Sequence, residues 1–234
     1  MIYGLPEQSP RHDPELTPTI LFLEKLLLFY VGGYHTVRLP ARCPIPARGP
    51  AILISNHISS LDPVMIQSGC RRLIHWMMAR EYYTIRSLRW FLGLIGAIPV
   101  DRARHDLGSI RKAIRALAAG QVVGMFPEGR IGLKEVGDFE VGAALLALRS
   151  GAPVYPVWVE GSTRGSEMVD AFLYPQKVTV VFGNAIALDR SDISRQSLER
   201  TAVMMRQAVL ALQSRCDNPP PPQLLKNKNS LHFS

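Results

Sequence analysis

The segment AILISNHISSLDP, residues 51–63, decides how this chain folds. Its first four residues are apolar and predict a buried strand, and the polar residues after them predict a turn. The Asp62-Pro63 pair then predicts the start of a helix. His57 therefore belongs to a strand-to-helix loop. Because ligands of open α/β sheets bind beyond the carboxyl ends of the strands, we expect His57 to be a reactive group.

Asp62 follows His57 by five residues, and two roles are open to it. A bent loop would bring its carboxylate onto the imidazole, fix the tautomer and stabilise the imidazolium that forms when the other ring nitrogen takes a proton. Alternatively, Asp62 is only the N-cap of the helix that Pro63 begins. The spacing alone leaves both roles possible.

Strand and helix patterns alternate along the rest of the chain. Strands are predicted at 51–54, 73–79, 97–100, 122–126, 154–159 and 177–182, and helices at 86–95, 106–120, 141–150 and 194–214. This alternation predicts an α/β layered domain with a largely parallel central sheet flanked by helices. We expect the domain to span residues 35–215, between an N-terminal segment at 1–34 and a disordered Pro-rich tail at 216–234.

Residues 17–31, TPTILFLEKLLLFYV, form the most apolar predicted helix. A membrane-spanning helix needs roughly 20 apolar residues, and this run is shorter and is interrupted by Glu24 and Lys25. We therefore expect a helix that lies at a membrane interface, with packing against the sheet as the alternative. Residues 1–14 contain acids and prolines ahead of any apolar run, which is not the layout of a signal peptide.

The chain has 234 residues and a formal net charge of +8 at pH 7. Between Arg71 and Arg115 there are ten Lys and Arg residues against three acids, so an anionic partner is expected: a phosphate ligand or anionic lipid. No nucleic-acid-binding signature accompanies this charge. The three cysteines, Cys43, Cys70 and Cys216, show no spacing typical of a disulfide framework or metal site, which favours a reducing compartment.

Four short motifs occur in an order that is typical of one known family. They are His57-x4-Asp62, Gly96-x5-Arg102, Phe126-Pro127-Glu128-Gly129 and Val154-Tyr155-Pro156-Val157-Trp158-Val159. With them, residues 35–190 resemble the glycerolipid acyltransferase family, whose type member is 1-acylglycerol-3-phosphate acyltransferase. Each motif alone has little specificity, whereas four in the family's order are specific.

The third motif departs from the common form of that family. Family members usually continue Phe-Pro-Glu-Gly with Thr-Arg-Ser, whereas here Arg130 follows Gly129 directly. This form is similar to lysophospholipid acyltransferase domains that recycle phosphatidylethanolamine. Two acceptors therefore stay open, lysophosphatidic acid and another lysophospholipid such as lysophosphatidylethanolamine.

The resemblance implies an enzyme that moves a fatty acyl group from acyl-CoA or acyl carrier protein to a hydroxyl of a lysophospholipid. It implies a membrane-associated protein at the cytoplasmic face, with no metal and no cofactor. His57 is the expected general base, paired with Asp62, because a hydroxyl is too weak an acid to attack unaided.

The same resemblance implies which residues bind the acceptor. Arg102 matches the family's phosphate-binding arginine, and Arg130 is a second candidate, because a guanidinium suits bidentate phosphate contacts. Glu128 and Gly129 match the family's acceptor-binding motif. An ion pair between Glu128 and a nearby arginine is the alternative role for that carboxylate.

Two other classes of protein compete with this interpretation. A non-catalytic lipid-binding protein of the same fold would not need His57 and Asp62, so their intact spacing argues against it. A Ser-His hydrolase would act on the same lipids with water as acceptor, but the chain has no Gly-x-Ser-x-Gly motif.

Overall fold

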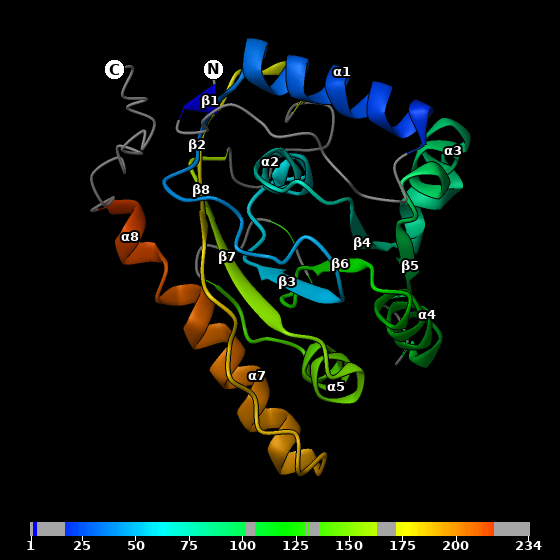
Figure 1. Cartoon of the computed structure of the whole chain (residues 1–234), viewed down its shortest axis with the longest axis vertical. Helices are drawn as coiled ribbons and strands as arrows, with labels where there is room; N and C mark the ends of the chain where they lie inside the picture. Colours follow the sequence, from blue (N-terminus) through cyan, green and yellow to red (C-terminus); the bar gives the residue numbers. More distant parts are fainter. Residues whose placement is uncertain are drawn as a thin grey trace, which may run out of the picture.

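The computed structural model describes residues 2–3, 17–101, 106–129, 131, 136–162 and 172–217. This part of the chain forms one sheet with helices on both faces (Figure 1). The strands are β1 (Ile2–Tyr3), β2 (Thr36–Arg38), β3 (Ala51–Ser55), β4 (Ile74–Ala79), β5 (Ile98–Val100), β6 (Val122–Met125), β7 (Val154–Glu160) and β8 (Lys177–Phe182). Every strand predicted from the sequence is present, and the short strands β1 and β2 were not predicted.

The strands lie in the order β1-β2-β8-β7-β3-β6-β4-β5. The five strands from β7 to β5 are parallel to one another, as are the three strands from β1 to β8. The two groups meet where β8 runs antiparallel to β7. The predicted largely parallel sheet is therefore confirmed.

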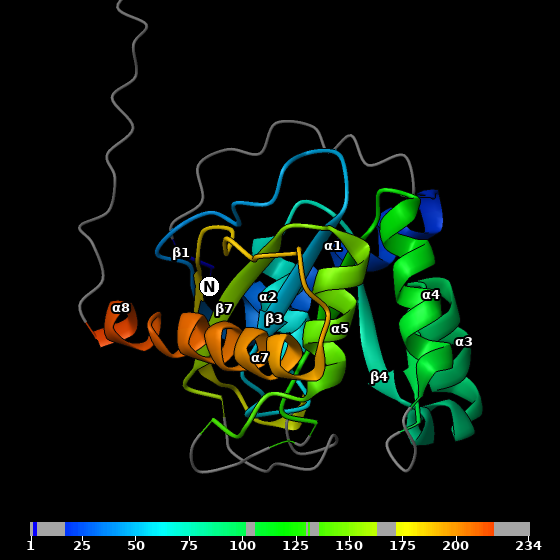
Figure 2. The same ribbon diagram turned by 90° about the horizontal axis from the view of Figure 1, so that it is seen from below.

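The described helices are α1 (Pro18–Tyr34), α2 (Asp62–Gly69), η1 (Arg80–Thr84), α3 (Arg86–Leu94), α4 (Leu107–Ala118), α5 (Val141–Ser150), α7 (Arg195–Leu210) and α8 (Gln213–Asp217). Helices α1 and α2 cover one face of the sheet, and α5 and α7 cover the other (Figures 1 and 2). The single helix predicted at 194–214 is divided into α7 and α8. Of the predicted tail, residues 218–234 lie outside the described residues.

Strand β3 lies in the middle of the sheet and is buried on both faces. Ile52 and Ile54 pack in the cluster beneath α5 and α7, while Ala51 and Leu53 pack in the cluster beneath α1 and α2. Hydrophobic burial on both faces explains the unbroken apolar run in the sequence. The chain leaving the carboxyl end of β3 therefore emerges at the centre of the molecule, and it carries His57.

Helix α1 begins as predicted, because the Thr17 hydroxyl accepts a hydrogen bond from the Ile20 backbone N–H at 3.4 Å and Pro18 follows it. Its inner face packs on the core, where Val31 is completely buried. Its outer face leaves the Phe29 side chain 78% exposed. The helix thus packs against the domain on one side and presents apolar side chains on the other. No helix in the described part of the chain is both long and apolar enough to cross a membrane.

The end of α1 is held by the buried His35. Its Nδ1 accepts a hydrogen bond from the Gln176 backbone N–H at 3.2 Å, and its Nε2 lies 2.9 Å from the Tyr30 hydroxyl. Burial lowers the pKa of His35, which favours the neutral imidazole that this arrangement requires. The contact fixes α1 to the start of β8.

Candidate active site

His57, in the loop between β3 and α2, meets Asp62 at the start of α2. The Nδ1 atom of His57 lies 3.0 Å from Asp62 Oδ2. Leu61 occupies the N-cap position of α2 and makes no side-chain capping bond, while Asp62 is the first residue of the helix. The Asp62 carboxylate therefore turns back onto the loop and the imidazole instead of capping the helix.

The Asp62 carboxylate is completely buried and has four hydrogen-bond donors. Besides the imidazole, Oδ2 accepts the backbone N–H groups of Ile58 at 2.7 Å and Ser59 at 2.8 Å. The Ser162 hydroxyl donates to Oδ1 at 2.9 Å. Because buried carboxylates need such compensation, this network explains how a charge is held at the centre of the fold.

This arrangement determines the tautomer of His57. A carboxylate only accepts hydrogen bonds, so in the neutral imidazole the proton is on Nδ1 and the lone pair is on Nε2. The ring is fixed from the side as well, because it stacks on Phe126 with ring centroids 3.8 Å apart and planes inclined by 11°. Phe126 stacks in turn on Trp76, whose centroid lies 4.9 Å away. His57 is thus oriented by a carboxylate and by an aromatic stack.

Glu128 binds the main chain of His57. Its Oε1 accepts the His57 backbone N–H at 3.1 Å, and its Oε2 accepts the Gly137 backbone N–H at 3.2 Å. Burial raises the pKa of Glu128, and the two hydrogen bonds and the Arg206 charge oppose that rise. Both oxygens are bound to backbone groups, and within the described residues no arginine is in ion-pair contact with Glu128.

Gly129 follows Glu128 in a left-handed conformation, with φ of 67°. Other residues would be strained at this φ, and a Cβ atom here would lie 2.4 Å from Glu140 Oε1, so that the Glu140 side chain would have to move. The Gly129 N–H also donates to the Phe126 carbonyl at 3.2 Å and closes the turn. The backbone conformation therefore explains why a glycine occupies this position. The predicted contact of Gly129 with the acceptor stays a prediction.

Three residues to which the sequence analysis gave no role support the site. The Asn56 side chain exchanges two hydrogen bonds with the Val159 backbone, at 2.9 and 2.8 Å, and so fixes the end of β3 against β7. Ser162 contacts Asp62, as described above. Arg206, on α7, donates to the carbonyls of Val136 at 2.7 Å and Gly137 at 3.0 Å. No local pattern marks these residues, because their partners are far away in the sequence.

A cavity of about 750 Å³ opens beside His57, between the β4–β5 edge, α4 and α5. Much of its lining is apolar, with Met77, Ile110 and Leu146 among the side chains. His57 is one of the residues that border it. The basic imidazole therefore faces a space that can take an apolar chain of a ligand.

Arg102 and Arg130 lie outside the described residues. Their neighbours Asp101, Gly129 and Ile131 line the same cavity as His57. The Asp101 backbone N–H donates to Asp106 Oδ2 at 3.0 Å. The phosphate-binding roles of both arginines stay predictions. The described residues contain no group of three or more His, Cys, Asp and Glu side chains that could hold a metal ion.

A histidine paired with a carboxylate beside an apolar cavity is an arrangement that an acyl-transfer enzyme can use for proton transfer. A sequence model of the acyltransferase family matches residues 37–160, which is more than half of the chain. The chain belongs to this family, as a glycerolipid acyltransferase, and it is an O-acyltransferase.

Individual relatives agree with this assignment. The 1-acyl-sn-glycerol-3-phosphate acyltransferase of Bacillus subtilis is 27% identical over 198 residues, which is 82% of this chain and 94% of that protein. The enzyme of the same name from Pseudomonas aeruginosa is 28% identical over 141 residues, 58% of this chain and 54% of that protein. The crystal structure of PlsC, the 1-acyl-sn-glycerophosphate acyltransferase of Thermotoga maritima, is similar with a TM-score of 0.65. At 20% identity, over 83% of this chain and 81% of that one, the likeness shows the shared fold.

Proposed function

We propose that this enzyme transfers a fatty acyl group from a thioester, acyl-CoA or acyl carrier protein, to the free hydroxyl of 1-acyl-sn-glycerol-3-phosphate and so produces phosphatidic acid. The observation that carries the proposal is the buried His57–Asp62 pair at 3.0 Å, with its imidazole at the border of an apolar cavity. The names of the relatives support the choice of acceptor.

The reaction needs one base that later acts as an acid. Nε2 of His57 removes the proton of the acceptor hydroxyl while the oxygen forms its bond to the thioester carbonyl carbon. The tetrahedral intermediate then collapses, the carbon–sulfur bond breaks, and the imidazolium returns the proton to the leaving thiolate. Asp62 stabilises the imidazolium between these two steps. No covalent acyl-enzyme is needed.

Binding of the acceptor requires positive charge near the base. We assign the phosphate contact to Arg102, with Arg130 as a second contact, by their positions in the motifs. The alternative acceptor is lysophosphatidylethanolamine, which the Arg130 position next to Gly129 favours. The two acceptors differ in the charge of the head group, so an arginine-based site would favour the phosphate monoester.

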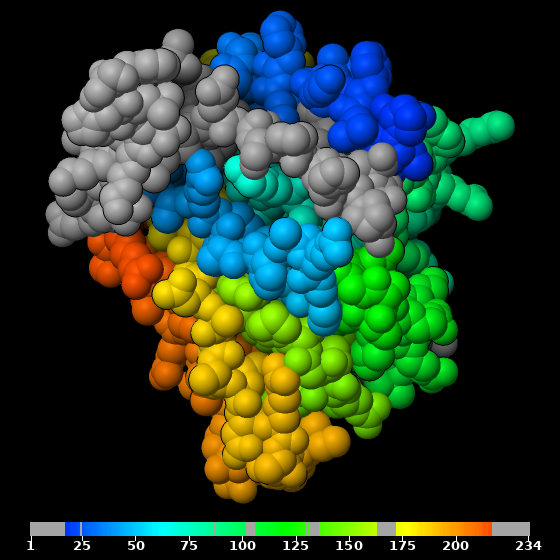
Figure 3. Space-filling view, viewed as in Figure 1, coloured from blue at the N-terminus to red at the C-terminus, as the bar shows by residue number. Residues whose placement is uncertain are grey.

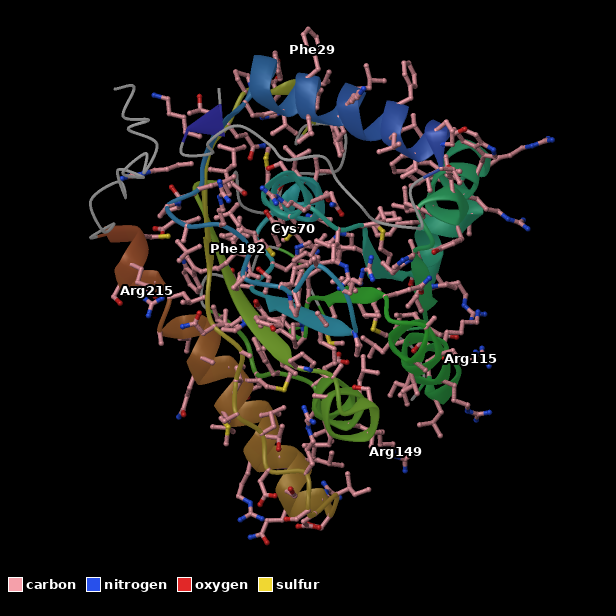
Figure 4. The ribbon with its side chains drawn as sticks, viewed as in Figure 1. Phe29, Cys70, Arg115, Arg149, Phe182 and Arg215 are labelled. Atoms are coloured by element: carbon pink, nitrogen blue, oxygen red, sulfur yellow. The ribbon has the colours of Figure 1, made fainter. Side chains whose placement is uncertain are left out.

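The enzyme acts at the cytoplasmic face of a membrane in this proposal. The outer face of α1 supports contact with a membrane, because the helix lies at the surface of the molecule (Figure 3) and its Phe22, Leu26 and Phe29 side chains are exposed. Phe29 points away from the molecule (Figure 4). A second exposed apolar segment, Phe172 to Tyr174, lies beside α1, where the Tyr30 hydroxyl donates to the Phe172 carbonyl at 2.5 Å. A contiguous apolar surface of this kind is typical of membrane contact.

The decisive experiment offers the purified enzyme labelled acyl-CoA and acyl carrier protein with a panel of lysolipids, and compares it with His57→Ala. We expect transfer to lysophosphatidic acid, and a loss of about 100- to 10,000-fold in the variant with lipid binding retained. Activity within about threefold of wild type would overturn the base mechanism. Retained binding without any wild-type turnover would favour the non-catalytic lipid-binding protein.

A second variant tests the hydrolase alternative. Ser60 lies in the same loop as His57 and borders the cavity, so a covalent acyl-enzyme could use its hydroxyl. Ser60→Ala should keep activity within about threefold, because the proposed mechanism uses no nucleophile of the protein. Loss of activity together with release of free fatty acid by the wild type would favour the hydrolase.

A further inference from the structure

Two cysteines that are far apart in the sequence meet beneath α2. The sulfur atoms of Cys43 and Cys70 are 2.7 Å apart, although 27 positions separate the residues in the chain. Cys70 is buried at the C-cap of α2, in the same apolar cluster as Phe182 (Figure 4), and Cys43 is partly exposed. In the structure all three cysteines of the chain are thiols. The spacing of the cysteines in the sequence did not indicate this contact, because residues 27 positions apart meet only in the folded chain.

Cys43 belongs to the segment 39–50, which joins β2 to β3 and contains no helix or strand. Arg72, two residues after Cys70, also binds this segment. The Arg72 guanidinium donates to the carbonyl of Pro46 at 3.2 Å and to that of Gly49 at 2.6 Å. The guanidinium already holds the segment in place. Bringing the two sulfur atoms together therefore does not carry the entropy cost of closing a flexible loop.

We propose that Cys43 and Cys70 form a disulfide that ties the 39–50 segment to the C-terminal end of α2. A disulfide bond is about 2.05 Å long, so the sulfur atoms need to approach by well under 1 Å. Asp62 is the first residue of this helix, at the end opposite Cys70. The bond would hold the helix that carries the catalytic carboxylate, and it is independent of which acceptor the enzyme uses.

Thiol–disulfide exchange with a small disulfide such as oxidised glutathione supplies the oxidant. The partly exposed Cys43 thiolate attacks a sulfur of glutathione disulfide, and one glutathione thiolate leaves. Cys70 then loses its proton and attacks the Cys43 sulfur, and the second glutathione leaves. The two protein thiols lose two electrons and two protons in total, and glutathione disulfide becomes two glutathione thiols.

The test treats the full-length enzyme with either dithiothreitol or oxidised glutathione, quenches it with acid and an alkylating agent, and maps the peptides. Trypsin cleaves after Arg42, Arg48 and Arg71, so Cys43 lies in peptide 43–48 and Cys70 in peptide 49–71. We expect these two peptides to be joined in the oxidised sample, with Cys216 still alkylated. Separate, fully alkylated peptides, or a link that includes Cys216, would overturn the proposal.

Two variants and a melting experiment complete the test. The ring closed by the bond would contain about 28 residues, so the oxidised wild type should melt roughly 5–10 °C above the reduced form. Cys43→Ser should remove this difference, whereas Cys216→Ser should keep both the link and the difference. Equal melting temperatures for the linked and reduced forms would contradict a stabilising bond. Cys43→Ala repeats the test without a hydroxyl, in case the serine variant folds poorly.

Discussion

Glu128 accepts the backbone N–H of His57 at 3.1 Å, so the third motif of the sequence holds the main chain of the first. The two residues are 71 positions apart and belong to loops that leave the neighbouring strands β3 and β6. Burial raises the pKa of Glu128, because it disfavours the charged form. The carboxylate that positions the His57 loop therefore lies in an environment that opposes its charge. This relationship explains why the two loops share one wall of the cavity.

Glu128→Gln should destabilise the enzyme and reduce its activity together. Both carboxylate oxygens accept a backbone N–H, and the amide nitrogen of glutamine would face one of these donors. Leaving such a buried donor unpaired costs about 1–3 kcal/mol, which corresponds to a melting temperature lower by roughly 3–10 °C. The measurements are thermal unfolding and turnover.

The control for this variant is Glu199→Gln, which changes an exposed carboxylate on α7. It should alter neither stability nor turnover measurably, because exposed ion pairs contribute little. If Glu128→Gln is as stable as this control and loses only its affinity for the acceptor, the carboxylate acts on the substrate and not on the His57 backbone.

Asp62→Asn should behave differently from Glu128→Gln. An asparagine oxygen can take the place of Oδ2 and accept the same donors, and the amide nitrogen would then face the Ser162 hydroxyl, which can rotate and accept. The fold should therefore survive, but the negative charge that stabilises the imidazolium is lost. We expect turnover to fall by about 100- to 10,000-fold with a melting temperature close to wild type.

Thermal unfolding and steady-state kinetics on the same preparation decide this prediction. Normal turnover by Asp62→Asn would reduce Asp62 to a structural residue of the loop. Asp62→Ala should unfold more readily than Asp62→Asn, because it leaves the Ile58 and Ser59 backbone donors without an acceptor.

Arg102→Ala should raise the KM for the lysophospholipid more than the KM for the thioester. The reason is that the phosphate it is proposed to bind belongs to the acceptor, and charge-assisted hydrogen bonds to such groups contribute about 1.5–3 kcal/mol, or roughly a 10- to 100-fold change. Arg102→Lys keeps the charge but loses the bidentate fork, so its KM for the lysophospholipid should lie between those of the wild type and Arg102→Ala. An effect on acyl-CoA alone would place Arg102 on the donor side.

Membrane binding should depend on the outer face of α1. Replacing the exposed Phe22, Leu26 and Phe29 together by glutamine removes apolar area without touching the core, so the fold should be retained. We expect at least a tenfold loss of binding to neutral phosphatidylcholine vesicles in cosedimentation. Salt should weaken binding only to vesicles that contain anionic lipid, because it screens the basic surface.

Val203→Gln provides the matched control, because Val203 is an exposed apolar residue on α7, on the other face of the sheet. It should bind vesicles as the wild type does. If the triple variant also binds as the wild type does, α1 is not the membrane-contacting element, and the basic surface alone would have to hold the enzyme at the bilayer.

Much of the fold could be read from the chain because its signals are local. The apolar run 51–54 and the turn after it predict a buried strand and a loop, and both are present. The helix predicted at 141–150 is present with those bounds, and Gly151 ends it in a left-handed conformation, with φ of 68°. The strands β1 and β2 escaped prediction because two or three residues carry no recognisable periodicity.

The candidate site could be predicted only in part. His57 and Asp62 are five residues apart, so one loop can bring them together, and their spacing was readable. The partner of Glu128 could not be predicted. The two expected roles were a contact with the acceptor and an ion pair with an arginine, and neither of them is the hydrogen bond to the His57 backbone. Arg206 was missed because it reaches the 136–137 carbonyls from a helix about 70 positions away.

By itself, the sequence determined most of the strands and helices, and it placed a histidine and an aspartate five residues apart after one strand. Those features follow from periodicity, helix-start residues and spacing, which act between near neighbours in the chain. Only the tertiary structure decided that Ser162 would reach Asp62 across 100 positions, that Glu128 would hold His57, and that Cys43 would meet Cys70. These contacts depend on the order of strands in the sheet, because that order sets which loops lie side by side.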